Sequence, residues 1–182
     1  MFKLRELSRE DMPIINSWRN NPDIIECLGA PYRYINQAVD DRWFDSYMTQ
    51  RNNTIRCVII TGNEKVIGLV SLTDIDYIHR KTTFHIMIGD KDNQSKGAGT
   101  YALACMLRHA FNNMNLHHVE LDVLSSNVKA IGLYEKMGFV REGVFREACF
   151  KNGVYVDMIH YALLENKYRK HIGEETRFKN AK

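Results

Sequence analysis

The sequence is poor in the residues that build metal sites and disulfide frameworks. It holds four cysteines in 182 residues, widely separated and without a C-x-x-C pair. This spacing argues against zinc ligation and against a cross-linked scaffold, and no metal is expected. We expect the cysteines to be reduced, with Cys57 and Cys105 buried, because both lie within apolar patterns.

Long hydrophobic runs are also missing. No apolar stretch approaches the ~20 residues that a membrane-spanning helix needs. The opening Met-Phe-Lys-Leu-Arg-Glu-Leu lacks the apolar core of a secretion signal. We therefore expect a cytoplasmic protein with no membrane partner.

The body of the chain has no surplus of either charge. The formal net charge is +3, and residues 165–182 alone carry six Lys or Arg against three Glu. The remaining residues are balanced, which argues against a nucleic-acid-binding face, since such faces show a basic stripe on the folded domain. We interpret residues 165–182 as a solvated basic C-terminal helix or tail.

Residues with strand and helix periodicity alternate along the whole chain without a low-complexity linker, which predicts a single domain over residues 1–182. Ser8 is suited to cap the first helix and Asn21-Pro22 to end it, and Asn152-Gly153 is a type I′ hairpin signal. In the long fourth helix, apolar residues recur at i, i+3, i+4, i+7 and i+8; they are Leu103, Met106, Leu107, Ala110 and Phe111.

We expect strands near residues 2–7, 54–61, 66–75, 82–89, 119–124, 140–151 and 154–163, and helices near residues 9–21, 36–48, 97–114 and 127–137, with a short helical turn up to residue 28.

This order of elements predicts an α+β or α/β layered fold built on one mixed sheet.

A glycine-rich turn stands between the third central strand and the long helix. It reads Gln94-Ser95-Lys96-Gly97-Ala98-Gly99. Glycines expose their backbone N–H groups, and the start of a helix adds partial positive charge, so a diphosphate is the natural ligand, with Lys96 adding attraction. A glycine loop that merely bends the backbone is the alternative.

Two nucleotide folds also use such glycines. The spelling Gly97-x-Gly99-x-x-Ala102 fits the dinucleotide-binding fingerprint, with Glu120 about twenty residues on. In that fingerprint the glycines follow the strand directly, whereas polar residues separate them from the strand here. The acidic residue of the fingerprint lies at the end of its strand, whereas Glu120 lies inside its strand. An NAD-dependent oxidoreductase therefore stays a weaker alternative, and no G-x-x-x-x-G-K-[ST] P-loop is present.

The helix near residues 127–137 carries a second polar constellation. Asn127 and Tyr134 are two helical turns apart and share a face, with the small apolar Ala130 and Ile131 between them. A capping asparagine and a half-buried tyrosine would also explain the two polar residues. The order Q-x-x-G-x-G, then a strand, then N-x-x-A-x-x-L-Y-x-K-x-G-F is what favours a functional site.

In that order the motifs resemble the acetyl-CoA site of the GNAT acyltransferase superfamily, over nearly the whole chain. The resemblance implies a mostly antiparallel central sheet flanked by helices, and acetyl-CoA as cosubstrate. It implies that the backbone of the glycine turn holds the pyrophosphate, over Gln94, Ser95, Lys96, Gly97, Ala98, Gly99 and Thr100. It also implies that Met87, Ile88 and Gly89 pair with the pantetheine, that Asn127 bonds it beside Ala130, and that Tyr134 faces the sulfur.

The acceptor is left open by conflicting signals. Residues 138–157 resemble the branch that contains ribosomal-protein N-terminal and spermidine acetyltransferases, whereas Trp18-Arg19-Asn20-Asn21-Pro22 is similar to amino-sugar N-acetyltransferases. An amino sugar or other small amine, a protein N-terminus and a polyamine remain candidates. Homodimers are common in this branch, so a homodimer is a possible assembly.

The expected reaction is direct attack of a primary amine on the thioester. Members of the superfamily often carry a glutamate as base early on the strand before the glycine turn, and this chain has Thr83 there. His85 lies on the same strand face and its ordinary pKa of ~6.5 suits a base. Glu120, Asp122 and a water relay are the alternatives. Thr83 also supports a different reading, a non-catalytic acetyl-CoA-binding regulatory module.

Overall fold

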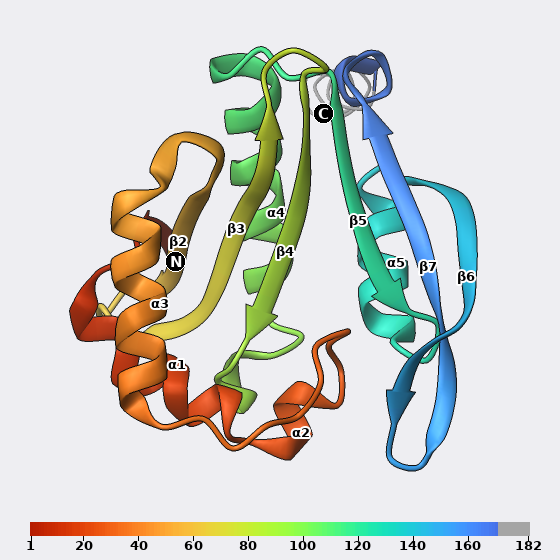
Figure 1. The fold of residues 1–182 in the computed structure, drawn as a ribbon. Helices are drawn as coiled ribbons and strands as arrows, with labels where there is room; N and C mark the ends of the chain where they lie inside the picture. Colours follow the sequence, from red (N-terminus) through yellow and green to blue (C-terminus); the bar gives the residue numbers. More distant parts are fainter. Residues whose placement is uncertain (171–182) are drawn as a thin grey trace.

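The computed structural model describes residues 1–170, and within them the chain forms a seven-stranded sheet in the order β1-β2-β3-β4-β5-β7-β6 (Figure 1). Neighbouring strands run antiparallel except β4 and β5, which are parallel. The strands are β1 (Phe2–Glu6), β2 (Ile55–Thr61), β3 (Val66–Asp76), β4 (Lys81–Ile88), β5 (His118–Leu124), β6 (Val140–Lys151) and β7 (Val154–Leu164). The predicted mixed, mostly antiparallel sheet is confirmed.

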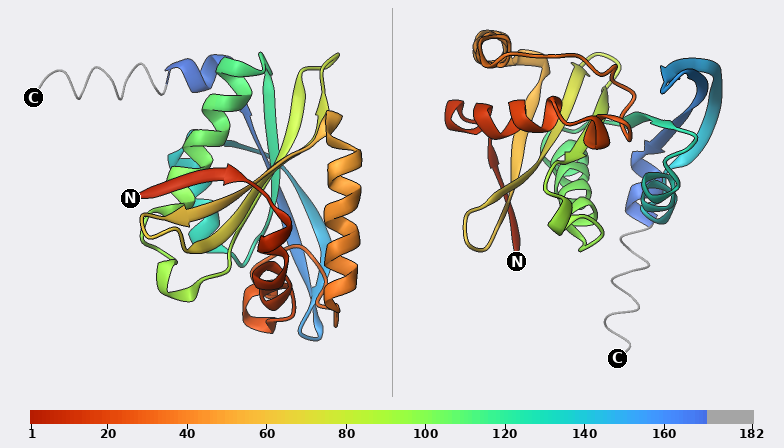
Figure 2. Two further views of the ribbon diagram at one scale, coloured as in Figure 1. Left: turned by 90° about the vertical axis from the view of Figure 1, so that its left-hand side faces the viewer. Right: turned by 90° about the horizontal axis from the view of Figure 1, so that it is seen from below.

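Helices cover both faces of the sheet. On what we call the front face lie α1 (Met12–Arg19), α2 (Pro22–Ile25) and α3 (Gln37–Thr49), and on the back face α4 (Ala98–Arg108) and α5 (Val128–Lys136) (Figure 2). Short helical turns occupy Arg9–Asp11, Arg51–Asn53 and Lys91–Asn93, and residues 165–170 are helical. None of the helices within residues 1–170 has the length and apolarity needed to cross a membrane.

Strand alternation divides the core into two layers. In β4, Phe84 is buried on the back face, whereas Met87 is buried on the front face against α1. The back layer also contains the five apolar residues expected of the long helix, each at most 2% exposed. Their periodicity in sequence therefore identified the buried side of α4 correctly.

Two expectations for the helices need correction. The first helix does not begin as α-helix at Arg9: a 3-10 turn comes first, because the Asp11 carboxylate accepts from the Ser8 N–H at 2.9 Å and tightens the turn. The long helix is α-helical only to Arg108 and continues as a π-helix over His109–Asn113.

Cys57 and Cys105 are less buried than the sequence predicts. All four cysteines are free thiols, but these two are half-buried where β1 and β2 meet α4. They border a cavity of about 370 Å³ between those elements, Cys57 from β2 and Cys105 from α4, so neither side chain is fully enclosed.

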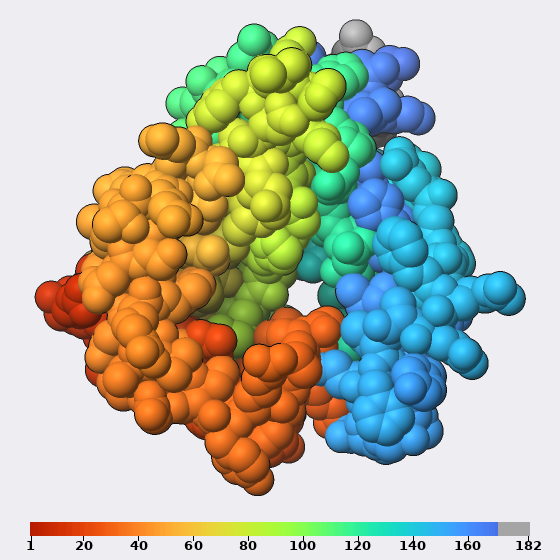
Figure 3. Space-filling view, viewed as in Figure 1, coloured from red at the N-terminus to blue at the C-terminus, as the bar shows by residue number. Residues whose placement is uncertain are grey.

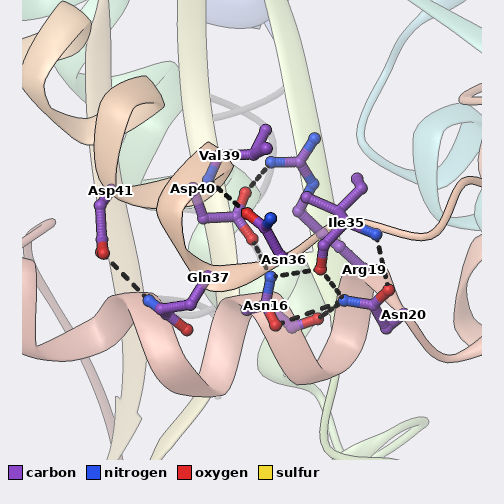
Figure 4. Close-up of polar contacts among 9 residues, drawn as sticks. All are labelled: Asn16, Arg19, Asn20, Ile35, Asn36, Gln37, Val39, Asp40 and Asp41. Carbon is purple, nitrogen blue, oxygen red and sulfur yellow. Dashed lines mark hydrogen bonds and ion pairs between the residues drawn. The ribbon is translucent and has the colours of Figure 1, made fainter.

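A buried polar cluster joins α1 to α3 (Figure 4). The carboxylate of Asp40 is fully buried, is ion-paired with Arg19 and accepts from Asn16 Nδ2 at 2.6 Å. Asn16 and Asn20 donate to the Ile35 carbonyl at 3.0 and 2.7 Å, and Asn20 Oδ1 accepts from the Ile35 N–H at 2.9 Å. The cluster thereby fixes the end of the segment that connects α2 to α3.

Replacing Asp40 by alanine should lower the free energy of unfolding by about 3 kcal/mol. This is the lower end for a broken buried pair, because the side chain of Arg19 is 32% exposed and keeps some contact with water. Urea denaturation followed by circular dichroism measures the change. The neighbouring Asp41→Ala is the control, since within the described part of the chain Asp41 bonds only Gln37 one helical turn away. Equal effects of the two substitutions would contradict the importance of the cluster.

Candidate active site

The central feature of the site is the separation of β4 from β5. These strands pair only through Lys81–Thr83 with His118–Glu120, and beyond them β4 runs to Ile88 with no partner strand on that side within residues 1–170. In the space-filling view an opening passes through the molecule here, between β4, β5, the β6–β7 hairpin and the segment after α2 (Figure 3). An unpaired strand edge at an opening is suited to bind an extended ligand by strand addition.

The opening is closed on its lower side by contacts between distant parts of the chain. Lys151 at the end of β6 donates to the Ile25 carbonyl at 3.0 Å and also to the Ala30 carbonyl. Asn152 donates to Glu26 at 2.7 Å. The hairpin and the segment after α2 therefore form one rim of the opening.

The glycine turn leads into the N-terminus of α4. Gly97 has φ +88°, a left-handed conformation in which any other L residue is strained. Its carbonyl accepts from the Tyr101 N–H at 3.0 Å, so the N–H groups of Ala98, Gly99 and Thr100 begin the helix without partners in it. Among the residues before the helix, Gln94, Ser95, Lys96 and Gly97 are all exposed. This is a helix start open to an anion.

Three predicted parts of the site converge at Gly99. A Cβ at Gly99 would lie 3.4 Å from Leu133 in α5 and 3.9 Å from Ile86 in β4. Gln94 also reaches back to β4, donating through Nε2 to the Ile88 carbonyl at 3.1 Å. The helix start, the open strand edge and α5 are thus neighbours, as an acyl-CoA site needs.

Gly89, at the end of β4, is a glycine for a structural reason. A Cβ there would lie 2.0 Å from the Trp18 ring, which packs directly on the backbone. Sequence reasoning had assigned Gly89 only to the pantetheine edge. The close packing of Trp18 on this backbone was not visible from the sequence.

The side chain of Asn127 is used within the protein. Its Oδ1 accepts from the Ala130 N–H at 3.2 Å and caps α5, while its Nδ2 donates to the Cys27 carbonyl at 3.0 Å. The structure therefore confirms that Asn127 caps the N-terminus of α5. A pantetheine bond to the Asn127 amide stays a prediction; the second N–H of Nδ2 and the second lone pair of Oδ1 are the groups it would use.

Tyr134 lies on α5 in the back layer of the core. Its ring is 6% exposed and packs between Phe84 and Phe139, with ring centroids 6.4 and 5.8 Å away. Burial raises the pKa of Tyr134 to about 12. The hydroxyl is therefore neutral throughout the physiological range and available as a hydrogen-bond donor.

Polar residues form a band across the front face where the strands separate. Strand register places Arg56, Ser71 and His85 side by side on β2, β3 and β4. We call the whole group the polar band, which consists of Arg56, Ser71, Thr73, Thr83, His85, Glu120, Asp122 and His160. No helix lies in front of β4 and β5 at this level (Figure 1).

His85 is the member of the band best suited to accept a proton. Its Nε2 lies 2.9 Å from Thr73 Oγ1. The His85 side chain is exposed, yet desolvation by the surrounding protein lowers the pKa of His85, and the positive charge of Arg56 lowers it further. The ring is therefore mostly neutral at pH 7.

The arrangement defines a class of protein, a transferase that takes an acyl group from coenzyme A. A family model described as an acetyltransferase (GNAT) domain matches residues 2–140, and the chain belongs to this family. It is an acetyl-CoA-dependent N-acetyltransferase. The sheet, with its single parallel pair among residues 1–170, excludes the dinucleotide-binding alternative.

The chain is similar to two spermidine N(1)-acetyltransferases. It is 34% identical to that of Vibrio cholerae over 91% of this chain and 94% of the relative. It is 32% identical to that of Escherichia coli K12 over 91% of this chain and 87% of the relative. A crystal structure of the Vibrio cholerae spermidine N-acetyltransferase with CoA and spermine superposes with a TM-score of 0.86, at 34% identity over 92% of this chain and 97% of the other.

Gly97→Ala should weaken acetyl-CoA binding by about tenfold, because an alanine at this φ strains the turn by ~1–2 kcal/mol and shifts its amides. Isothermal titration with acetyl-CoA measures the dissociation constant. Gly132→Ala is the matched control, since Gly132 lies within α5 with open space around it. An unchanged dissociation constant for Gly97→Ala would show that the pyrophosphate binds elsewhere.

Proposed function

We propose that this enzyme acetylates a primary amine of a polyamine. The pyrophosphate of acetyl-CoA binds at the start of α4 and the pantetheine follows the open edge of β4. The thioester then lies in the opening, with Tyr134 behind it and the polar band in front. The convergence of these elements at Gly99 supports this placement.

The observation that carries the proposal is the set of carboxylates beside the strand separation. Glu120 and Asp122 project from β5 on the side of His85, and Asp74 lies beside it on β3. A polyamine carries several positive charges at pH 7, because aliphatic amines titrate near 10.4, and it suits such a site. The likeness to two spermidine acetyltransferases and to a spermine complex supports the same acceptor.

The amine must lose a proton before it attacks. At pH 7 only about one aliphatic amine in 10³ is neutral, a handicap of ~4–5 kcal/mol. His85 takes this proton on one ring nitrogen, and the neutral amine nitrogen then bonds to the thioester carbon. As the C–S bond breaks, the nitrogen loses its second proton to water, which leaves the neutral amide, and the coenzyme A thiolate takes up a proton from water.

Tyr134 stabilises the leaving sulfur by a hydrogen bond. A phenol with a pKa of about 12 is a weaker acid than a thiol near 8.5. Full proton transfer to the thiolate is therefore uphill by ~5 kcal/mol, whereas donation of a hydrogen bond is not. The buried ring fixes the direction of the hydroxyl.

Tyr134→Phe should lower kcat by about tenfold or more, which corresponds to a lost hydrogen bond to a charged atom. Acetyl-CoA affinity should hardly change, because the aromatic packing is kept. Steady-state kinetics by thiol release and isothermal titration separate the two effects. An unchanged kcat would refute the role of the phenol.

One observation favours a second acceptor, an amine that also carries an anionic group, such as an amino-sugar phosphate. The Arg56 guanidinium stacks 4.5 Å from the Trp43 ring centroid, and its Nε is buried without a hydrogen-bond partner among residues 1–170. Burial lowers the pKa of Arg56, with a smaller contribution from Arg19. An unpaired, half-buried guanidinium on the acceptor side is suited to an anion.

Thiol release from acetyl-CoA over a panel of acceptors tests the proposal. The panel contains spermidine, spermine, an amino-sugar phosphate, an uncharged amino sugar and a short peptide with a free N-terminus. We expect kcat/KM for spermidine to exceed that for the peptide by about 100-fold, since each favourable charge contact contributes ~1–3 kcal/mol. A preference for the amino-sugar phosphate that Arg56→Gln abolishes would overturn the polyamine assignment.

The cytoplasmic location, the single domain and the homodimer remain predictions. Residues 171–182 of the expected basic tail lie outside the described residues.

A further inference from the structure

We propose that Thr73 and Asp74 form a hydrogen-bond relay with His85. The relay holds the imidazole in the tautomer with its proton on Nε2 and a free lone pair on Nδ1. The relay rests on the proposed role of His85 as the base. Thr73 and Asp74 are positioning residues in this scheme, and neither was singled out by the sequence.

The geometry decides where the protons lie. Thr73 Oγ1 donates to Asp74 Oδ2 at 2.8 Å and lies 2.9 Å from His85 Nε2. A carboxylate can only accept and a hydroxyl has a single proton, so the proton between Thr73 and His85 belongs to Nε2. No residue among 1–170 bonds Nδ1 of His85, which therefore keeps a free lone pair.

A β-bulge brings Asp74 to this position. The register of β3 with β4 shifts between Thr73 and Asp76, and Asp74 has φ +52°. In a regular strand the residue after Thr73 would point to the opposite, back face. The bulge turns this carboxylate outward to the cleft side instead, as bulges beside active sites do. The conformation costs ~1 kcal/mol or more for a residue other than glycine.

The groups around the imidazole shift the pKa of His85 in opposite directions. Partial burial and Arg56 on β2 lower the pKa of His85, whereas Asp74 on β3 and Asp122 on β5 raise it. Asp122 is itself bonded to His160 on β7, with 2.7 Å between Oδ1 and Nδ1. When the amine proton arrives at Nδ1, the imidazolium formed is stabilised through Thr73 by the Asp74 carboxylate.

Kinetics of relay variants give the first test. Thr73→Val keeps the shape and removes the hydroxyl, and we expect kcat to fall by about tenfold with the KM for acetyl-CoA unchanged. Thr73→Ser should restore most of the activity. Thr49→Val is the control, because among the residues that the structure describes the Thr49 hydroxyl bonds only carbonyls of its own helix. Equal activity of the Val and Ser variants at position 73 would overturn the relay.

The pH profile gives a second readout that a structural role would not change. Asp74→Asn keeps the size of the side chain, and asparagine tolerates this φ well, so the bulge is retained. Because the Asp74 charge raises the pKa of His85, its loss should move the acid limb of kcat/KM to lower pH. An unmoved limb would contradict the electrostatic part of the relay.

The tautomer itself is measured by long-range ¹H–¹⁵N spectra of the imidazole. We expect the Nε2-protonated form of His85 in the native enzyme and a mixture in Thr73→Val. An Nδ1-protonated ring in the native enzyme would overturn the proposal, and so would full activity of His85→Ala. In the His85→Ala background, Thr73→Val should have no further effect on kcat.

These measurements are made with whichever acceptor of the panel is fastest. If the native enzyme prefers an amino-sugar phosphate and the relay variants lose activity with it, the relay is supported and the polyamine assignment is contradicted. If the native enzyme prefers spermidine and Thr73→Val acetylates it at the full rate, the polyamine assignment is supported and the relay is contradicted.

Discussion

The whole site depends on the separation of two parallel strands. β4 and β5 stay paired through only three residues each, and beyond that point the sheet has an internal edge. Elsewhere in a sheet such unpaired backbone groups would invite aggregation or require cover. Here they line an opening that is reached from both layers of the fold. Tyr134 lies in the back layer and His85 on the front face, so the two candidate catalytic side chains lie on opposite sides of the sheet.

The pKa values of the two candidate catalytic side chains are shifted by different environments. Tyr134 is enclosed by aromatic rings, and burial alone raises the pKa of this phenol to about 12, which keeps its proton available. His85 lies in the open polar band, where partial burial and Arg56 lower the pKa of the imidazole and keep it neutral. One group is thus a stable donor and the other a ready acceptor. Direct transfer of an acetyl group to an amine is helped by that division of roles.

The rim of the opening links the acceptor side to the stability of the fold. The segment between α2 and α3 is tied to α1 through Ile35 and the buried Asp40 cluster at one end. At its other end, Lys151 and Asn152 of the β6–β7 hairpin hold it. Residues more than a hundred positions apart in sequence therefore enclose one opening. The same segment also contacts Asn127 on α5 through the Cys27 carbonyl, so a change in either anchor would alter the shape of the opening.

Local patterns in the sequence determined the elements, the glycine turn and the family. The periodicity of α4, the left-handed Gly97 and the Asn152-Gly153 hairpin are short-range signals, because each follows from residues a few positions apart. Only the tertiary structure decided which side chains meet. The packing of Trp18 on Gly89, the half-burial of Cys57 and the bond from Asn127 to Cys27 depend on strand register and on contacts across the sheet. The bulge that turns Asp74 toward Thr73 leaves no periodic trace in the sequence, because its register shift exists only relative to β4.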